Sequence, residues 1–577
     1  MKVTRAFIAS LAMLLTRLSL QAQTPPPAPD PAQDPAAARA VARISVMNGV
    51  VSVRRGDSGE AVAAAVNAPL TGTDRLFTGD GSRAEIQFDA LNMIRLAPAT
   101  EVRLGELAYH HYQVQIAGGT TEFRVLRDND AEIEISTPSI AVHPLKHGIY
   151  RITVKPDGSS EVTVREGEVE ISSPKGTEKL GQGKTMEARG AADNPEFQTT
   201  GAIAGDAWDK WNADRDHDLE KSVSGRYVNP DINGTEELDA NGRWVNDPAY
   251  GQVWVPTVDP GWAPYRVGRW VWVDYYGWTW VSADPWGWAP YHYGRWYQGP
   301  YGWAWWPGAI AGPYYWQPAL VGFFGWGGVG IGFGFGNIGW VGLAPYERFY
   351  PGYGAGIYGR GFGAMNVVRN TNVGNIYRNA RVANGVTSMA SNQFGRSGVT
   401  TANYVHASSA DLAKAGSVRG GVPMTPSRES THFSSAAAGA THGSESSHFY
   451  SSRASSSVSH VSFDQQRQAM ARSASSMAAR SAAPAPASAP IHTSTNSVSP
   501  PNRGTTPAAP SAPATQSGGW QRFSGNNSGA SGHSQPVRIN PSVVQSRTSA
   551  PSNSSNSSGR GASSSAPHSS APRGGRR

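Results

Sequence analysis

The sequence of 577 residues contains no cysteine. This absence excludes disulfide bonds, thiolate metal sites, a cysteine nucleophile and a lipid anchor on cysteine. The sequence also shows no nucleophile paired with a base, no carboxylate pair, no metal-ligand cluster and no phosphate-binding loop. We therefore predict no catalytic residues, no metal site and no cofactor, and an enzyme is the weakest hypothesis.

A long hydrophobic run is missing from the N-terminus. Lys2 and Arg5 precede an apolar run of ten residues, 6–15, and Ala22 offers a small residue for cleavage. A membrane-spanning helix needs about 20 apolar residues, so the pattern predicts a secretory signal over residues 1–22. We expect an exported protein of the periplasm or cell surface, with a Pro/Ala linker over residues 23–42.

Acidic residues are scarce in the C-terminal part, which is rich in Ser, Ala, Pro and Gly. From residue 401 onward there are fifteen Lys or Arg and only four acids. This composition predicts a disordered tail over residues 396–577. The tail either attracts anionic surfaces or acts as a solvated spacer.

Residues 43–190 show short apolar alternations bounded by Gly, Pro and Asp, which predict half-buried strands and an all-β domain. In one example Ala84, Ile86 and Phe88 alternate with polar residues. A second pair of alternations suggests a hairpin with its turn at Glu166-Gly167. The histidines of this domain are interpreted as surface or loop residues, since no spacing fixes a tetrahedral metal site; they are His110, His111, His143 and His147.

Several stretches of this domain resemble the FecR family, named for the ferric-citrate regulator. The resemblance rests on residues 49–53, on Thr78-Gly79-Asp80-Gly81-Ser82-Arg83-Ala84 with the alternation after it, on residues 94–96 and on residues 164–169 with 180–183. It implies a periplasmic β domain, which in signalling members relays receptor occupancy through a membrane helix to a cytoplasmic segment. Because the N-terminal run is predicted to be a signal, we do not expect that transmembrane relay here.

One linking helix is predicted over residues 203–224. Asp206 can cap its start, Trp208, Trp211 and Leu219 can share an apolar face, and Gly225 can stop it. Three aspartates, Asp214, Asp216 and Asp218, are interpreted as part of a solvated acidic face, because they lack the rest of a calcium loop.

Residues 225–395 form a Trp/Tyr/Gly-rich repeat domain. Gly-Arg-Trp begins at Gly242, Gly268 and Gly294, a period of 26 residues. Each unit reads as one β-hairpin; in the second, Trp270 and Trp272 can face Trp278 and Trp280 across the strands. The block resembles a Trp/Tyr-rich bacterial family of unknown function that often follows a FecR-like domain.

The tryptophans of the repeats have two interpretations. They form the core of a cysteine-free domain, which we favour, or some are displayed and bind sugars, quaternary amines or aromatic ligands. The candidate exposed, ligand-binding rings are Trp254, Trp262, Trp278, Trp280, Trp288 and Trp296.

The uncharged run over residues 319–345 contains ten glycines. Since each glycine disfavours a helix, and residues 329–336 alternate apolar residues with glycine, the run predicts a strand rather than a membrane span. The fold class is thus mainly β, with a FecR-like domain, one linking helix, an aromatic hairpin-repeat domain and a disordered tail.

Two hypotheses of function follow. In the first, the protein is a non-catalytic exported binding or scaffolding protein of the cell envelope. In the second, it is a periplasmic signalling regulator that senses an envelope signal through the FecR-like domain. Expected partners are an envelope polymer or glycan, a protein or the membrane surface, without a transmembrane span after signal removal; a nucleic acid is not expected.

Overall fold

The computed structural model describes residues 39–190, 195–311, 314–328, 334–352, 366–439, 449–453 and 461–482. All of them belong to one compact unit, Met1–Ser494. The predicted signal and most of the predicted linker lie outside the described residues, as does the tail beyond residue 482. The mainly β class predicted from the sequence is confirmed.

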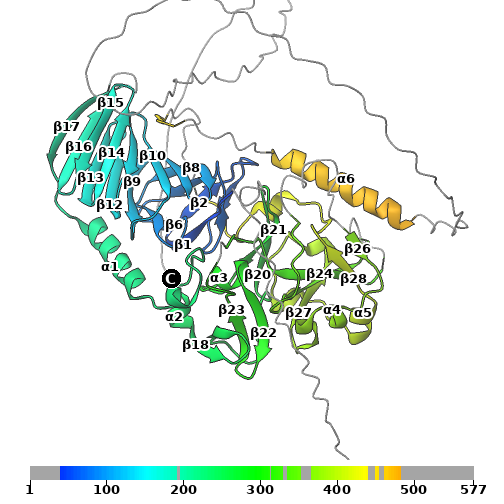
Figure 1. The fold of residues 1–577 in the computed structure, drawn as a ribbon. Coiled ribbons are helices and arrows are strands. Elements are labelled where there is room, and N and C mark those ends of the chain that lie inside the picture. The colour runs from blue at the N-terminus through cyan, green and yellow to red at the C-terminus, as the bar shows by residue number, and fades with distance from the viewer. Residues whose placement is uncertain are drawn as a thin grey trace, which may run out of the picture. The chain divides into compact units, whose positions relative to one another are not determined.

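Strands β1 to β17 form an N-terminal β domain of two sheets (Figure 1), whose apolar side chains share one hydrophobic core. The first sheet has the order β3–β2–β5–β8–β9–β10–β11–β14–β15. The second has the order β4–β1–β6–β7–β9–β12–β13–β16–β17. The strands are β1 (Ala42–Asn48), β2 (Val51–Arg54), β3 (Ala61–Ala63), β4 (Pro69–Leu70), β5 (Arg75–Thr78), β6 (Arg83–Gln87), β7 (Asn92–Leu96), β8 (Glu101–Ala108), β9 (His111–Val125), β10 (Glu132–Ser136), β11 (Ala141–Pro144), β12 (Gly148–Val154), β13 (Ser160–Glu166), β14 (Glu168–Ser173), β15 (Gly176–Gly181), β16 (Lys184–Arg189) and β17 (Glu196–Gly201).

Strand β9 belongs to both sheets. Its first half pairs with β8 and β10, and its second half pairs with β7 and β12. Gly119 lies at the transition with a φ of 90°, and a Cβ there would lie 2.4 Å from Oγ1 of Thr100. Glycine is therefore required at the point where the strand passes from one sheet to the other.

The predicted hairpin at Glu166-Gly167 is wrong. Strand β13, before this turn, pairs with β12 and β16 in the second sheet, whereas β14, after it, pairs with β11 and β15 in the first. Gly167, with a φ of 88°, marks a corner between the sheets. A hairpin and a corner require the same alternation and the same glycine, so the local sequence does not distinguish them.

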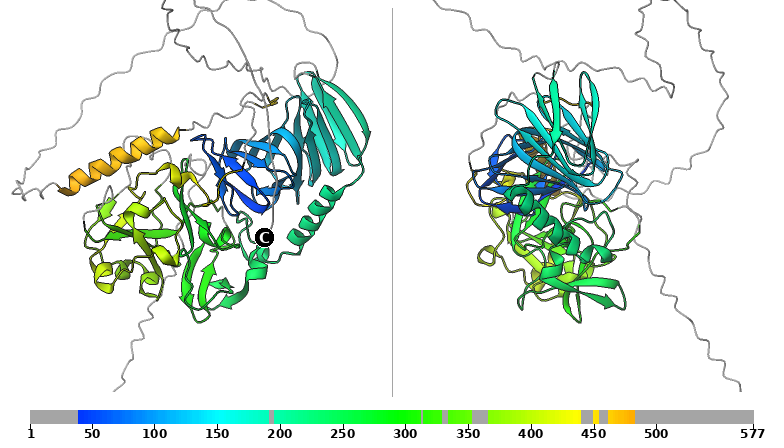
Figure 2. Two further views of the ribbon diagram at one scale, coloured as in Figure 1. Left: turned by 180° about the vertical axis from the view of Figure 1, so that it is seen from behind. Right: turned by 90° about the vertical axis from the view of Figure 1, so that its left-hand side faces the viewer.

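Helix α1 (Ala207–Lys221) lies against the second sheet (Figure 2). The predicted cap is present. The Asp206 carboxylate accepts the backbone N–H groups of Trp208 and Asp209, and the Asp209 carboxylate accepts the backbone N–H of Asp206. The predicted apolar face is only partly right. Trp208 is buried, but the other buried residues of α1 are Asn212 and Asp216, so polar contacts hold the helix in place.

Each Gly-Arg-Trp repeat forms one hairpin, as predicted. The cross-strand pairs Trp270–Trp280 and Trp272–Trp278 are T-shaped, with ring centroids 5.2 and 5.4 Å apart. The six strands are β18 (Gly242–Asp247), β19 (Gly251–Pro256), β20 (Gly268–Val273), β21 (Gly277–Ser282), β22 (Arg295–Gly299) and β23 (Gly302–Trp306). Strands β18, β19, β23 and β22 make one sheet, and β20 with β21 makes another.

The repeated glycines have a common structural reason. In each hairpin the glycine faces an indole of the partner strand. A Cβ would lie 2.5 Å from the Trp254 ring at Gly242, 2.5 Å from the Trp280 ring at Gly268 and 2.6 Å from Nε1 of Trp305 at Gly294. A side chain at any of these positions would displace a buried ring, so the repeat requires glycine there.

A third sheet, built from residues that follow the hairpins in the sequence, has the order β26–β28–β24–β25–β27. Its strands are β24 (Val321–Trp326), β25 (Asn337–Gly342), β26 (Asn366–Val368), β27 (Val386–Ala390) and β28 (Gly416–Arg419). Most of the strand predicted over residues 329–336 lies outside the described residues. Within the described part of the chain, no helix combines the length and apolar character needed to cross a membrane. The helices beyond α1 are α2 (Leu238–Asn241), α3 (Ala289–His292), α4 (Val373–Ile376), α5 (Ser409–Lys414) and α6 (Phe463–Ala482), with short 3₁₀ turns at Ser224–Tyr227, Arg378–Arg381, Ser391–Gln393, Thr401–Asn403 and Arg428–Thr431.

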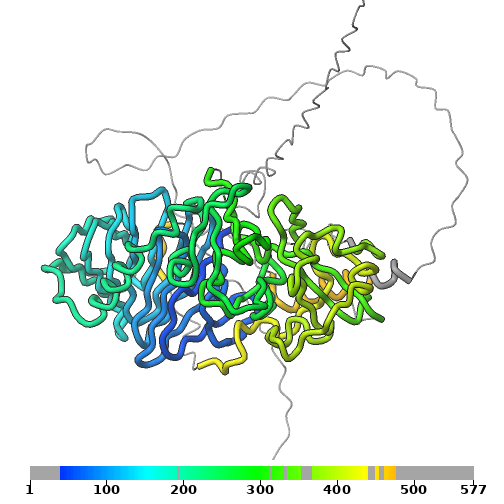
Figure 3. The backbone as a smooth tube through the Cα atoms, turned by 90° about the horizontal axis from the view of Figure 1, so that it is seen from below, coloured from blue at the N-terminus to red at the C-terminus, as the bar shows by residue number. Residues whose placement is uncertain are grey.

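Several of these elements lie within residues 396–482, for which the sequence predicts disorder. Strand β28 pairs with β24, and the Trp278 indole donates to the carbonyl oxygen of Met424. The yellow segment near residue 430 runs beside the blue strands of the β domain (Figure 3), where Arg55 donates to the carbonyl oxygen of Thr431. These Ser- and Gly-rich segments are ordered by pairing with distant strands, which local composition does not reveal.

Candidate functional site

The six candidate ring residues are mostly inside the protein. Five are at most 7% exposed, and Trp262 is half-buried against the same core. Four of the buried indoles donate N–H to a protein oxygen: Trp254 to Leu238, Trp278 to Met424, Trp288 to Asn233 and Trp296 to Pro290. The fifth, Trp280, is fully buried although its Nε1 has no hydrogen-bond partner. Because all five rings are buried, they form part of the core.

A network of buried charges joins α1 to the second sheet. The Asp216 carboxylate lies 2.6 Å from Nη2 of Arg95 and 2.8 Å from Nε of Arg124. Arg95 also pairs with Glu85 at 2.8 Å and with Glu122 at 3.4 Å. The predicted solvated position of Asp216 is therefore wrong: the arginines come from strands far away in the sequence, and helix periodicity could not reveal them.

The network extends to the loop before the aromatic hairpins. Arg215 of α1 lies 2.8 Å from Glu85 and 3.6 Å from Glu236. Arg43 of β1, whose side chain is fully buried, lies 2.9 Å from Glu237 and also pairs with Glu236. The β domain, α1 and the start of the aromatic domain are thus joined by ion pairs that are shielded from solvent.

Two carboxyl groups of the network have opposite pKa shifts. Burial raises the pKa of Glu122 to about 8, and the nearby guanidinium of Arg95 offsets only part of that effect. Burial also acts on Glu85, but the guanidinium groups of Arg95 and Arg215 outweigh it and lower its pKa to about 2. At neutral pH Glu85 is therefore ionised and Glu122 is mostly protonated.

A cavity of about 190 Å³, which we call the junction pocket, lies between the β domain and the aromatic domain. Its rings are Phe88, Tyr109, His110, Tyr112, Tyr293, Tyr314, Tyr315 and Trp316. Its charged residues are Asp89, Asp130, Asp231 and Arg39, so carboxylates outnumber the cation by three to one. A concave site lined by rings and a few carboxylates suits a small ligand.

Polar contacts hold the walls of the junction pocket in place. Tyr112 donates to Asp89 at 2.7 Å, and Nδ1 of His110 lies 2.8 Å from Asp130. The Tyr109 ring stacks on His110 with centroids 4.0 Å apart. Burial and the neighbouring Asp231 carboxylate raise the pKa of Tyr109 to about 12, so its hydroxyl stays protonated at neutral pH.

The opposite wall comes from the aromatic domain. Asp231 accepts the backbone N–H of Tyr314 at 2.9 Å. Trp316 stacks on His292 with centroids 4.7 Å apart, and its buried Nε1 has no hydrogen-bond partner. Burial lowers the pKa of His292 to about 3, so this imidazole is neutral. A ring wall with neutral and anionic groups disfavours an anionic ligand.

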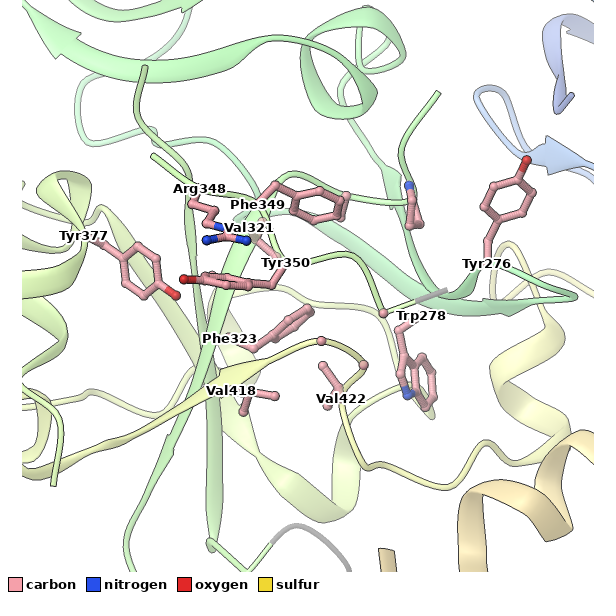
Figure 4. A pocket seen from close by; sticks show the side chains of 16 residues that line it. Tyr276, Trp278, Val321, Phe323, Arg348, Phe349, Tyr350, Tyr377, Val418 and Val422 are labelled. Carbon is pink, nitrogen blue, oxygen red and sulfur yellow. The ribbon is translucent and has the colours of Figure 1, made fainter. Parts of the chain in front are cut away.

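A second, smaller cavity of about 50 Å³ lies in the aromatic domain (Figure 4). Trp278, one of the candidate ring residues, lines it together with Phe323 and Tyr350. The Arg348 guanidinium lies 5.2 Å from the centroid of the Tyr350 ring. This volume holds little more than one or two water molecules, so the junction pocket is the better candidate for a ligand.

Among the described residues, no group of three or more His, Asp or Glu side chains could hold a metal ion. The prediction that the histidines are surface or loop residues is wrong for His143, which is 8% exposed. Its Nε2 lies 2.9 Å from the hydroxyl of Ser452, a residue 309 positions away in the chain. That separation explains why no local pattern indicated its burial.

Comparison with known families agrees with the two resemblances. Residues 74–170 match the family described as FecR protein, and residues 235–347 match a family of unknown function, DUF6600. The chain carries a FecR domain followed by a DUF6600 domain. Neither match is to an enzyme family.

Two solved structures match part of this chain. Both are crystal structures of candidate anti-sigma factors from Parabacteroides distasonis ATCC 8503. The structure at 2.50 Å is 21% identical, and the match covers 22% of this chain and 60% of the other chain. The structure at 1.65 Å is 18% identical, and the match covers 32% of this chain and 99% of the other chain. Each match has a TM-score of 0.20. A search of curated proteins finds no significant match.

The junction pocket lies where the FecR domain meets the DUF6600 domain, and the sequence did not indicate it. Tyr109 and His110 come from the turn before β9 of the FecR domain, while Asp231 and Trp316 flank the hairpins. The only available signal was the density of aromatic residues outside the repeats. Their convergence depends on how the two domains pack, which repeat spacing does not encode.

Proposed function

We propose that the protein is a non-catalytic, exported regulator that senses a small ligand in the junction pocket and passes the signal to a protein partner through its FecR domain. The observation that supports this best is the position of the pocket, whose walls come from both domains. The FecR match also favours a regulator over a scaffold, since the family takes its name from a regulator.

Ligand binding in this pocket is expected to affect the FecR domain, because that domain supplies one of the pocket walls. A ligand that contacts both walls binds best to one arrangement of the two domains and shifts the population towards it. The buried pairs of Arg43 with Glu236 and Glu237 connect the same two domains. A change at the pocket therefore reaches β1 and the sheet to which it belongs.

The chemistry of the lining favours a small organic cation, such as an amine or a quaternary ammonium group. Ring faces attract cations, and the carboxylates of Asp130 and Asp231 add Coulomb attraction. A neutral sugar would gain the ring contacts without the charge attraction, so it should bind more weakly.

Calorimetry with the full chain tests the ligand class. The probes are choline, spermidine and glucose as a neutral sugar. We expect a cationic probe to bind, and Asp231→Asn to weaken its binding by about tenfold because one pocket charge is removed. Asp214→Asn, on the exposed face of α1, is the matched control and should bind as the wild type does. Preference for glucose, or equal binding by the two variants, would contradict the ligand assignment.

Transcript profiling of a deletion strain tests the regulatory role. A regulator predicts a defined set of altered transcripts that the wild-type gene restores and that the Asp231→Asn gene does not restore. A scaffold predicts no such set, and that result would rule out the regulator. Fractionation of the same cells tests export, with the protein expected in the periplasm or at the cell surface.

A further inference from the structure

A polar patch on the first sheet of the FecR domain is covered by a distant part of the same chain. The patch consists of Gln113 on β9, Glu134 and Ser136 on β10, and His143 on β11; we call it the Glu134 patch. The covering segment is residues 449–453, more than 300 positions further along the sequence.

Two adjacent serines of the covering segment bind the Glu134 carboxylate. Ser451 Oγ donates to Oε1 at 2.6 Å, and Ser452 Oγ donates to Oε2 at 2.9 Å. Ser451 also accepts the side-chain amide of Gln113 at 2.9 Å, and Ser452 lies 2.9 Å from Nε2 of His143. Both hydroxyls are therefore recognised by more than one side chain.

The residues on either side of the serines add two further contacts. The backbone N–H of Tyr450 donates to the carbonyl oxygen of Thr137 at 2.9 Å. Arg453 Nη1 donates to the Glu132 carboxylate at 2.9 Å. Four consecutive residues thus contact the sheet, in the manner of a bound peptide.

The Glu134 carboxylate depends on this segment. It is only 2% exposed, and within the FecR domain Gln113 and Ser136 donate to it. Burial acts to raise the pKa of Glu134, but the donors, Ser451 foremost, lower it overall. A buried carboxylate that loses two donors is costly, so the uncovered patch favours any segment that restores them.

We propose that the Glu134 patch is a peptide-recognition site and that residues 450–453 are its tethered occupant. A partner that fits it is an extended peptide with two adjacent hydroxyl side chains followed by a cationic residue. The tether keeps the segment at a high effective concentration, so a partner binds only by displacing it. Peptide binding to this patch does not require a ligand in the junction pocket.

The test uses a fluorescent peptide of residues 448–454, His-Phe-Tyr-Ser-Ser-Arg-Ala, and fluorescence anisotropy with the full chain. In the wild-type chain the tether competes with the added peptide. Ser451→Ala with Ser452→Ala in the chain weakens the tethered occupant. We expect this variant to bind the peptide roughly tenfold more tightly than the wild type does, as expected for an intramolecular competitor.

Two controls separate recognition of the patch from other effects. A chain with Ser434→Ala and Ser435→Ala, a serine pair away from the patch, should bind as weakly as the wild type. A peptide with both central serines replaced by alanine should not bind any of the chains. The second control leaves the protein unchanged, so misfolding cannot explain its result.

Adding Glu134→Gln to the chain with the two tail alanines should abolish peptide binding. The proposal is overturned if the wild type and the tail variant bind the peptide equally, if neither binds it, or if the alanine peptide binds as well as the native one. Each of these outcomes means that the serine contacts do not govern occupancy of the patch.

Discussion

Replacement of Asp216 by asparagine tests whether buried charge, rather than apolar packing, holds α1 on the FecR domain. The Asp216 carboxylate is 9% exposed and bridges two guanidinium groups at 2.6 and 2.8 Å. Asparagine keeps the size of the side chain but removes the charge. The change therefore isolates the electrostatic contribution.

The expected cost is about 3 kcal/mol. Breaking a buried ion pair by removing one partner costs about 3 to 5 kcal/mol, because an uncompensated charge stays inside the protein. Arg95 keeps its contact with Glu85 at 2.8 Å, so the lower end of that range applies. Arg124 loses its closest carboxylate, since its other two ion pairs, with Glu166 and Glu220, are 3.8 and 3.9 Å long.

Urea unfolding of the full chain, followed by tryptophan fluorescence, measures the effect. Amide hydrogen exchange of α1 measures local release of the helix in the same variant. Asp214→Asn is the matched control on the same helix, because Asp214 pairs with Lys210 at an exposed i,i+4 position. Exposed pairs of this kind contribute about 0.3 to 0.5 kcal/mol.

The reasoning is refuted if Asp216→Asn lowers neither the unfolding midpoint nor the protection of the α1 amides by more than Asp214→Asn does. Such a result would mean that water solvates the two arginines once the carboxylate charge is gone. The helix would then be held by its other contacts, which include buried Trp208 and the Arg215–Glu85 pair.

Three further predictions concern stability. The pKa of Glu122 is raised from 4.5 to about 8 in the folded state. Between these pH values the folded protein binds one proton more than the unfolded chain, so its stability should fall as pH rises through that window. Glu122→Gln should flatten this fall in thermal unfolding scans. Gly268→Ala should destabilise by about 1 to 3 kcal/mol through overpacking against Trp280, whereas Gly181→Ala, in open space, should be nearly neutral; equal urea midpoints would contradict this. Trp280→Ala should cost about 3 to 5 kcal/mol because the ring is fully buried, and an unchanged midpoint would show that the ring is not part of the core.

The hairpins of the aromatic domain could be predicted because their signals are local. Trp270 and Trp280 meet across one turn, ten residues apart, so alternation and turn position place them opposite each other. The cap of α1 was predictable for the same reason, since Asp206 and Asp209 are three residues apart. In both cases the contacting residues lie within one element or one hairpin.

The candidate site could be predicted less well from the sequence than the hairpins could. The spacing of the repeats gave no means of telling a core indole from a displayed one, because both alternate in the same way along a strand. The burial of Trp254 and Trp288 depends on backbone and side-chain oxygens of Leu238 and Asn233, which lie outside the hairpins. The rings of the junction pocket carry no repeat signature at all.

The mainly β class, the order of the two domains and the period of the hairpins could be predicted, because each follows from residue spacing along the chain. The burial of particular polar residues could not be predicted, because it depends on how distant segments pack. Asp216 and Glu134 are acidic residues, which are usually exposed to solvent. Here arginines from distant strands contact Asp216, and serines from a distant segment cover Glu134. Covering a charge requires a partner in space, and the alternation of a strand or helix specifies only which face a residue occupies.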